Sequence, residues 1–167
     1  PLFDFPPDRL AALRTLGEGS VYDCLCAGAE RGEQDCAQFL ALLSELRLHC
    51  AGNIILVFGA GGDRPRLRRI DMGRAAAQWA DYAILTADNP RRERVEDICA
   101  DIAAAIGSDI PWEIVPDRGA AIRRALELAQ PGDIAALLGK GHETYIEENG
   151  VRHPFSEWET LDEYFRQ

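Results

Sequence analysis

Several residue types that carry chemistry in other proteins are scarce or unsuitably spaced in this sequence. No apolar run approaches the ~20 residues of a transmembrane helix, and the first residues lack the charged and then apolar pattern of a signal peptide. The five cysteines are odd in number, contain no Cys-x-x-Cys pair and are accompanied by only three histidines. This argues against a disulfide framework and a zinc site. We therefore expect a cytoplasmic protein with reduced thiols, no membrane contact and no metal ligands.

Positive charge is also in short supply. The formal net charge is −10, which opposes binding to nucleic acid or to an anionic membrane. The 18 basic residues include a single lysine, Lys140. A coding preference for arginine is the simplest reason, but the two side chains differ in shape and hydration. Position 140 is therefore a candidate for a site that requires a compact ammonium group.

The remaining pattern fits one α/β domain. The chain has 167 residues, 47% of them hydrophobic, so we expect a single domain over residues 1–167, with residues 1–19 unassigned. Strands are expected at 20–26, 53–58, 82–86, 113–115 and 133–138, with a hairpin at 145–151. Helices are expected at 35–49, 71–79, 95–106, 117–130 and 157–165. Asp117 and Ser156 are the expected caps of the last two helices. This alternation predicts an α/β, Rossmann-like three-layer fold, with a mostly parallel sheet of about six strands and helices on both faces.

Three loops that directly follow apolar strands have unusual compositions. They read GAGGDR (59–64), DNPR (88–91) and GKGHE (139–143). In open α/β sheets, ligands bind at the carboxyl ends of the strands. We therefore expect these three loops to converge on a small molecule. Each loop also has an ordinary explanation, because glycine-rich and Asp-Asn-Pro turns are common whatever the function.

The side chains on these loops suit a zwitterionic ligand. Arg64 and Arg91 can bind a carboxylate through paired hydrogen bonds, and Asp88 and Glu143 can accept hydrogen bonds from an ammonium group. Asn89 can donate and accept at once. The sequence has no Gly-x4-Gly-Lys-[Ser/Thr], Gly-x-Gly-x-x-Gly, Gly-x-Ser-x-Gly or His-Glu-x-x-His motif. We therefore predict ligand-binding residues but no catalytic residue.

The same loops resemble the C-terminal domain of the Mur ligases. Within that family they look most like the MurE ligases, which add meso-diaminopimelate to UDP-N-acetylmuramoyl-L-alanyl-D-glutamate in peptidoglycan precursor synthesis. The matching segments are VFGAGGDR (57–64), MG (72–73), AD (80–81), DNPR (88–91), DR (117–118), AI (121–122) and GKGHE (139–143). The resemblance extends from about residue 46 to residue 143, with the segments in the family's order.

The resemblance implies that this domain holds the incoming amino acid. Carried over to this sequence, the binding residues are Arg64, Asn89, Arg91, Gly139 and Glu143. In the family, DNPR accompanies meso-diaminopimelate, whose second carboxylate suits Arg91. A separate central domain carries the P-loop for ATP, and the amine attacks an acyl phosphate formed on the UDP-MurNAc-dipeptide. ATP and Mg²⁺ are thus expected to be held mostly by parts outside this chain, which alone is expected to be inactive.

The sequence departs from the family at the expected nucleotide segment. The family carries a VDYAHTPD-like stretch where residues 21–28 read VYDCLCAG. Asp23 remains a candidate partner of the nucleotide ribose, and Lys140 is a second candidate nucleotide contact. The departure leaves two alternatives open. One is a non-catalytic Mur-ligase-like module acting in protein interaction or regulation, and the other is an unrelated nucleotide-binding α/β domain.

Overall fold

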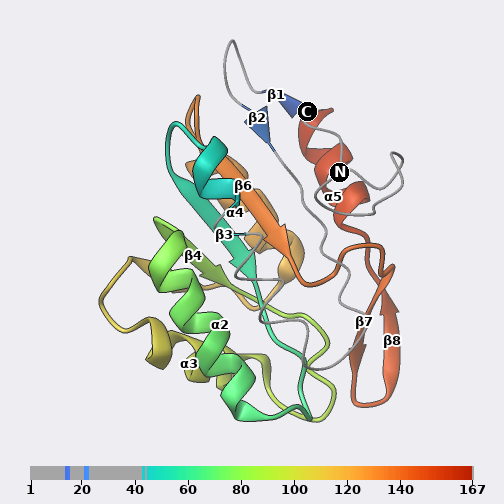
Figure 1. Ribbon diagram of the computed structural model, residues 1–167. Coiled ribbons are helices and arrows are strands. Elements are labelled where there is room, and N and C mark those ends of the chain that lie inside the picture. Colours follow the sequence, from blue (N-terminus) through green and yellow to red (C-terminus); the bar gives the residue numbers. More distant parts are fainter. Residues whose placement is uncertain (1–13, 16–20, 23–42, 44, 167) are drawn as a thin grey trace.

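The computed structural model describes residues 14–15, 21–22, 43 and 45–166 (Figure 1). Two short strands, β1 (Arg14–Thr15) and β2 (Val21–Tyr22), form an antiparallel pair. After a helical turn over residues 45–49, the elements in chain order are β3 (Ile54–Phe58), α2 (Arg66–Trp79), β4 (Tyr82–Leu85), α3 (Val95–Ile106), β5 (Trp112–Ile114), α4 (Arg118–Leu128), β6 (Ile134–Leu138), β7 (Tyr145–Glu148), β8 (Val151–Pro154) and α5 (Glu157–Phe165).

The central sheet is parallel and has the strand order β5-β4-β3-β6. The middle strands β3 (IILVF) and β6 (IAALL) are buried along their whole length, as expected for apolar strands covered on both faces. The described part of this sheet has four strands, whereas about six were expected. Of the strand predicted at 20–26, only β2 is described, and it pairs with β1; the rest of that segment lies outside the described residues.

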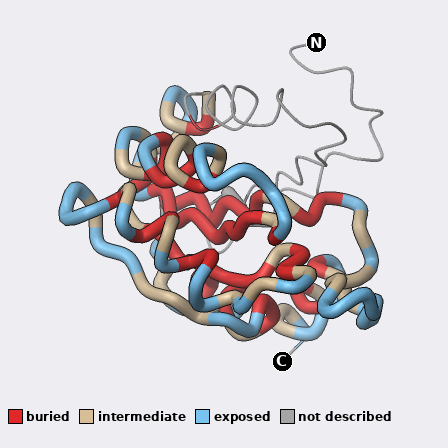
Figure 2. Tube along the Cα trace, turned by 90° about the horizontal axis from the view of Figure 1, so that it is seen from below, coloured by how far each residue is buried: buried red, intermediate tan, exposed pale blue. Residues whose placement is uncertain are grey.

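Helices cover both faces of the sheet, which confirms the predicted α/β architecture (Figure 1). Alternate strand residues such as Leu56 and Phe58 pack against α2 and α3, whereas Ile55 and Val57 pack against α4 and α5. The alternation follows from the two-residue period of a strand. Buried backbone accordingly runs through the centre of the molecule, with exposed backbone on the helices and turns around it (Figure 2).

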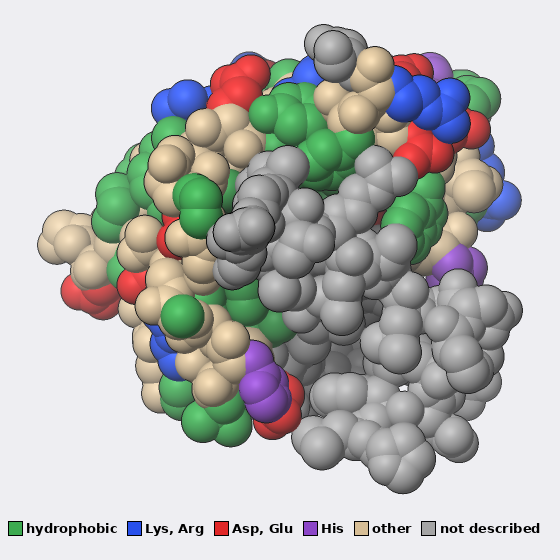
Figure 3. Space-filling view, turned by 90° about the horizontal axis from the view of Figure 1, so that it is seen from above, with side chains coloured by type: hydrophobic (Ala, Val, Ile, Leu, Met, Phe, Trp, Pro, Cys, Tyr) green, Lys and Arg blue, Asp and Glu red, His purple; other side chains and the backbone are tan. Residues whose placement is uncertain are grey.

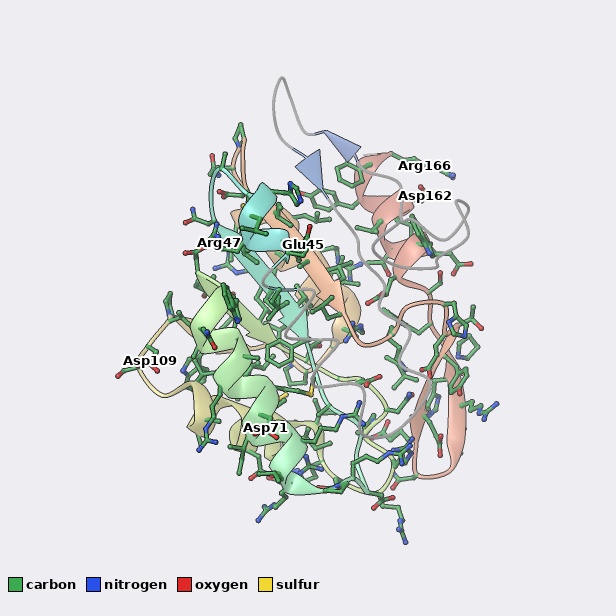
Figure 4. The ribbon with its side chains drawn as sticks, viewed as in Figure 1. Glu45, Arg47, Asp71, Asp109, Asp162 and Arg166 are labelled. Atoms are coloured by element: carbon green, nitrogen blue, oxygen red, sulfur yellow. The ribbon has the colours of Figure 1, made fainter. Side chains whose placement is uncertain are left out.

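Most helix boundaries agree with the sequence predictions. Helices α3 and α5 occupy the predicted ranges, and the side chains of Asp117 and Ser156 cap α4 and α5 by accepting from the backbone N–H groups of Ala120 and Glu159. The hairpin also forms, with strands β7 and β8 on either side of the turn at residues 149–150. On α5, Asp162 and Arg166 form an ion pair one turn apart, at 3.6 Å (Figure 4).

The predicted start of α2 was wrong. We expected a loop up to residue 69 and a helix from 71, but α2 begins at Arg66, directly after Pro65. Arg66, Arg68 and Arg69 are therefore helical, in keeping with the good helix propensity of arginine. Arg69 points inward, is only 1% exposed, and donates to Asp101 at 2.9 Å and to Glu93 at 2.7 Å. Carboxylates from α3 and from the loop before it compensate the buried charge, and the sequence pattern does not reveal such partners.

No helix in the described part of the chain has the length and apolar character needed to cross a bilayer. On the face drawn in Figure 3, basic and acidic side chains lie next to each other around the edge of the described surface.

Cys99 is a buried free thiol, and burial raises its pKa to about 12, so the thiol remains protonated.

Arg47 joins the beginnings of two strands. Its guanidinium donates to Asp81 Oδ2 and to the Gly52 carbonyl, both at 2.6 Å, and its position near the start of β3 is labelled in Figure 4. Asp81 precedes β4 and also accepts from the backbone N–H of Ile54 at 2.8 Å. The three loops of interest lie at the opposite, carboxyl ends of the strands.

Candidate functional site

The three loops predicted to converge do meet at the carboxyl edge of the sheet. They follow β3, β4 and β6, and these strands are neighbours in the sheet, so their loops emerge side by side. The Gly62 N–H donates to the Asn89 carbonyl at 2.9 Å. A side chain at position 62 would collide with the Pro90 carbonyl, so only glycine allows the first two loops to approach this closely.

Arg91 lies at the junction of the first two loops. Its Nη1 donates to the Gly62 carbonyl at 2.6 Å, and a Cβ on Gly61 would lie 3.2 Å from the same nitrogen. Arg91 has a positive φ of 52°, a conformation that non-glycine residues rarely adopt. A non-glycine residue in this region is a feature often found at ligand sites. The guanidinium keeps further N–H groups that have no hydrogen-bond partner among the described residues.

Arg64 extends from the same side of the first loop. Arg64 is exposed, and its Cγ lies 3.7 Å from the position that a Cβ would take on Gly61. The aliphatic stem of Arg64 and the guanidinium of Arg91, from neighbouring loops, therefore both lie beside the same short piece of backbone at Gly61. This arrangement can receive one or two carboxylate groups.

The second and third loops are joined by a polar cluster around Asn89. The Asn89 amide donates from Nδ2 to Glu143 Oε2 at 2.9 Å, and its Oδ1 accepts from Lys140 Nζ at 2.7 Å. Lys140 Nζ also donates to Glu143 Oε2 at 2.9 Å and lies 3.4 Å from Asp88 Oδ1. Gly139, with a φ of 114°, allows the third loop to turn beside Asp88. Carboxylates from both loops therefore surround one lysine.

The pKa of Glu143 reflects this cluster. Partial burial alone would raise its pKa, but the hydrogen bonds from Lys140 and Asn89 outweigh burial and lower the pKa below its ordinary value of 4.5. Glu143 is therefore an anion at neutral pH. An anionic carboxylate at this edge is suited to accept hydrogen bonds from an ammonium group.

This pKa shift leads to an expected pH dependence of stability. Because the pKa of Glu143 is lower in the folded state than in the unfolded state, its stabilising contribution is present above about pH 4.5 and is lost as the pH falls through the folded-state value. Urea unfolding at about pH 7 and about pH 3 measures this loss. We expect the loss to be smaller for Glu143→Gln than for the unchanged chain. An equal loss of stability in both chains would show that the folded structure does not stabilise the ionised form of Glu143.

The hairpin is a part of the site that the sequence did not place there. The backbone N–H of Arg91 donates to the Glu147 carbonyl at 3.0 Å, and the N–H of Asn149 donates to the Arg91 carbonyl at 2.6 Å. The Glu147 N–H also donates to Asn89 Oδ1 at 2.9 Å, and its carboxylate lies 3.9 Å from Arg91 Nε. The Asn149-Gly150 turn signalled a hairpin, but no spacing in the sequence indicated that β7 would lie along the second loop (Figure 1).

A second missed residue is Arg118, at the start of α4. It is fully buried and donates to the carbonyls of Ala87 and Leu138 at 2.9 Å each, and to Glu157 Oε1 at 2.6 and 2.8 Å. Ala87 and Leu138 directly precede the second and third loops. Arg118 therefore holds the bases of both loops together. The Asp117-Arg118 pair belonged to the matching motifs, but nothing in the sequence named its partners.

The structure describes one of the two candidate nucleotide contacts. Asp23 lies outside the described residues. Lys140 has no exposed side-chain surface, and its ammonium is surrounded by acceptors of this chain, so it does not face an external phosphate. Within the described ranges, no group of three or more His, Cys, Asp or Glu side chains is arranged to hold a metal ion.

Comparisons with known proteins agree with the motifs on these loops. A family model described as "Mur ligase, glutamate ligase domain" matches residues 35–141. The UDP-N-acetylmuramoyl-L-alanyl-D-glutamate–2,6-diaminopimelate ligase of Aquifex aeolicus is 47% identical over 112 residues, covering 67% of this chain and 23% of that protein. The ligase of the same name from Synechococcus elongatus is 51% identical over 104 residues, covering 62% and 21%.

A solved structure of a ligase with this name also has the same fold. It matches with a TM-score of 0.82 and 34% identity, covering 99% of this chain and 32% of that one. The chain thus spans between a fifth and a third of the length of these relatives. The family model, the two relatives and the solved structure all confirm the resemblance stated from the loop motifs. Because the family model matches more than half of its residues, the chain belongs to the Mur ligase family, in which it corresponds to the glutamate ligase domain.

Proposed function

We propose that this chain is the amino-acid-binding domain of an ATP-dependent ligase that adds meso-diaminopimelate to UDP-N-acetylmuramoyl-L-alanyl-D-glutamate. The observation that carries the proposal is the meeting of the three loops. Arg91 and the stem of Arg64 lie where the first loop meets the second, and the Asn89–Glu143 pair joins the second loop to the third. The names of the relatives supply the substrate class.

The chemistry of the loops agrees with a diamino acid that carries two carboxylates. The guanidinium of Arg91, fixed at one end by the Gly62 carbonyl, has N–H groups left for a ligand carboxylate. Glu143 is an anion at neutral pH and is suited to an ammonium group. A ligand with both kinds of charge satisfies both sides at once, whereas a ligand with one carboxylate leaves part of the arginine pair without a partner.

We assign to these residues the binding and orientation of the incoming amino acid. Carboxylate groups held by the arginines and an ammonium group held by Glu143 would fix the amino acid, so that its reacting amine enters the ligase reaction in one orientation. As the resemblance implies, we assign most of the ATP and Mg²⁺ contacts, and the UDP-MurNAc-dipeptide contacts, to other parts of the full ligase. Lys140 is used internally, and Asp23 stays a candidate nucleotide contact outside the described residues.

Isothermal titration of this chain tests the proposal. We expect saturable binding of meso-diaminopimelate and at least about tenfold weaker binding of L-lysine, which lacks the second carboxylate. Weak absolute affinity is compatible with the proposal, because the chain spans only part of its relatives. Equal binding of both amino acids would contradict the diaminopimelate assignment, and no binding of either would overturn the proposed function. The alternative of a non-catalytic interaction module is not favoured, since the relatives are ligases by name.

A further inference from the structure

We propose that Lys140 is a positioning residue: an internal counter-ion that holds Asn89 and Glu143 in the orientation that receives the amino group of the bound amino acid. The inference rests on the proposed function and deepens it. It also replaces the earlier expectation of a nucleotide contact at this lysine with a role inside the protein.

The first step is the fit between the ammonium group and its surroundings. Lys140 Nζ has Asn89 Oδ1 at 2.7 Å, Glu143 Oε2 at 2.9 Å and Asp88 Oδ1 at 3.4 Å, and its side chain is 0% exposed. An ammonium group has three N–H donors and no acceptor. Two of these donors bond to Asn89 Oδ1 and Glu143 Oε2, and the Asp88 carboxylate forms an ion pair with the same group. The Tyr145 ring, with its centroid 5.5 Å from Nζ, adds a cation–π contact.

The second step concerns the amide of Asn89. Its Oδ1 accepts from both Lys140 Nζ and the backbone N–H of Glu147, at 2.7 and 2.9 Å. Two donors on the same atom define which end of the amide is the oxygen. The Nδ2 end is therefore turned toward Glu143. Without the lysine, one of the two donors that fix this orientation is lost.

The third step concerns the carboxylate of Glu143. Its Oε2 accepts from both Lys140 Nζ and Asn89 Nδ2, at 2.9 Å each. The other oxygen, Oε1, has no hydrogen-bond partner among the residues that the structure describes. The lysine thus takes one oxygen and leaves the other for a ligand.

The fourth step is charge. The cluster contains the carboxylates of Asp88 and Glu143 and one ammonium group, so it lacks one positive charge. A ligand ammonium supplies that charge and brings the cluster to neutrality. A second internal cation would repel the ligand, and the loss of the lysine would remove the hydrogen bond and the charge that lower the pKa of Glu143.

The experiment compares Lys140→Met with Arg124→Met by titrating each variant of this chain with meso-diaminopimelate. Arg124 lies on α4 and pairs with Glu113 of β5, and it has no hydrogen bond or ion pair to the three loops among the described residues. Its variant therefore removes one positive charge without removing a contact of the cluster. We expect about a tenfold or greater loss of affinity for Lys140→Met and no loss for Arg124→Met. The loss should increase as the pH is lowered toward about 5, because Glu143 takes up a proton more readily without the lysine. A role in folding alone would not produce this pH profile.

A second measurement does not depend on whether the variant folds. Lys140 is the single lysine of the sequence, so a chain labelled with [¹⁵N]lysine has one side-chain ammonium resonance. We expect this resonance to shift during titration with meso-diaminopimelate and to saturate at the same concentration as the binding heat. Binding heat without a shift, or unchanged affinity in Lys140→Met, would overturn the positioning role and leave the proposed function intact. No binding by the unchanged chain would overturn both.

Discussion

Replacing Arg118 by leucine is expected to lower the free energy of unfolding by about 3–5 kcal/mol. The side chain is fully buried and donates to Glu157 Oε1 and to the carbonyls of Ala87 and Leu138. Leucine removes all of these donors, leaving the Glu157 carboxylate buried without this counter-charge and two carbonyl groups without this donor. A buried charge that loses its partner is among the most costly changes in a protein interior.

Urea unfolding followed by circular dichroism measures this loss. Arg123→Leu is the matched control, because the same substitution is made on the exposed side of the same helix and should change stability by no more than about 0.5 kcal/mol. Removing the carboxylate as well, in Arg118→Leu with Glu157→Leu, should recover part of the loss, since the buried group that lost this counter-charge is removed too. A loss below about 1 kcal/mol for Arg118→Leu would show that the buried pair does not hold the two loop bases together.

Replacing Arg91 by alanine is expected to weaken the binding of meso-diaminopimelate by about 1.5–3 kcal/mol, or about 10- to 150-fold. The guanidinium is placed by the Gly62 carbonyl and by a backbone with positive φ, and it presents its remaining N–H groups at the junction of two loops. Alanine removes the charge-assisted hydrogen bonds to a ligand carboxylate. The loss is expected to be much smaller for L-lysine, which has no second carboxylate to lose.

Isothermal titration of two further variants gives this prediction its controls. Arg91→Lys should bind with intermediate affinity, because an ammonium group keeps the charge but cannot form the paired hydrogen bonds of a guanidinium. Arg92→Ala removes the neighbouring charge, which is 79% exposed and paired with Asp63 at 3.0 Å, and should leave the affinity unchanged. Unchanged affinity for meso-diaminopimelate in Arg91→Ala would remove the assignment of this ligand.

The two predictions concern different levels of the same edge of the sheet. Arg118 joins the bases of the second and third loops, whereas Arg91 lies on the second loop and is partly exposed. A loss of stability in the first variant and a loss of affinity without loss of stability in the second would separate the support of the site from its binding surface. The cluster around Lys140 joins the second and third loops.

The elements that the sequence predicted best are those with strong local patterns. Strand β3 is a continuous apolar run between turn residues, and helix α3 has its isoleucines on one side, so burial follows directly from the period. Helix α4 starts where Asp117 offers a cap. The start of α2 could not be predicted in this way, because the burial of Arg69 depends on Glu93 and Asp101, which lie 24 and 32 residues away.

The candidate site likewise has parts that local sequence patterns predict and parts that depend on tertiary contacts. That three loops would meet could be predicted, because each follows an apolar strand and the carboxyl ends of parallel strands share one edge. The placement of the hairpin beside Arg91, and the partners of Arg118, could not be predicted from spacing. Both depend on hydrogen bonds between residues that are distant in the chain.

By itself, the sequence determined the α/β class, the three loops at the carboxyl ends of the strands and the residue types on them, because strand and helix periods and turn residues act locally. Tertiary structure alone decided which atoms face one another. Burial removes water from Lys140, Arg69 and Arg118, so each must find acceptors within the protein, and those acceptors come from whichever segments the fold brings near. The lysine that composition marked as unusual therefore acquired its partners, and its proposed role, only from the way β4, β6 and the hairpin pack together.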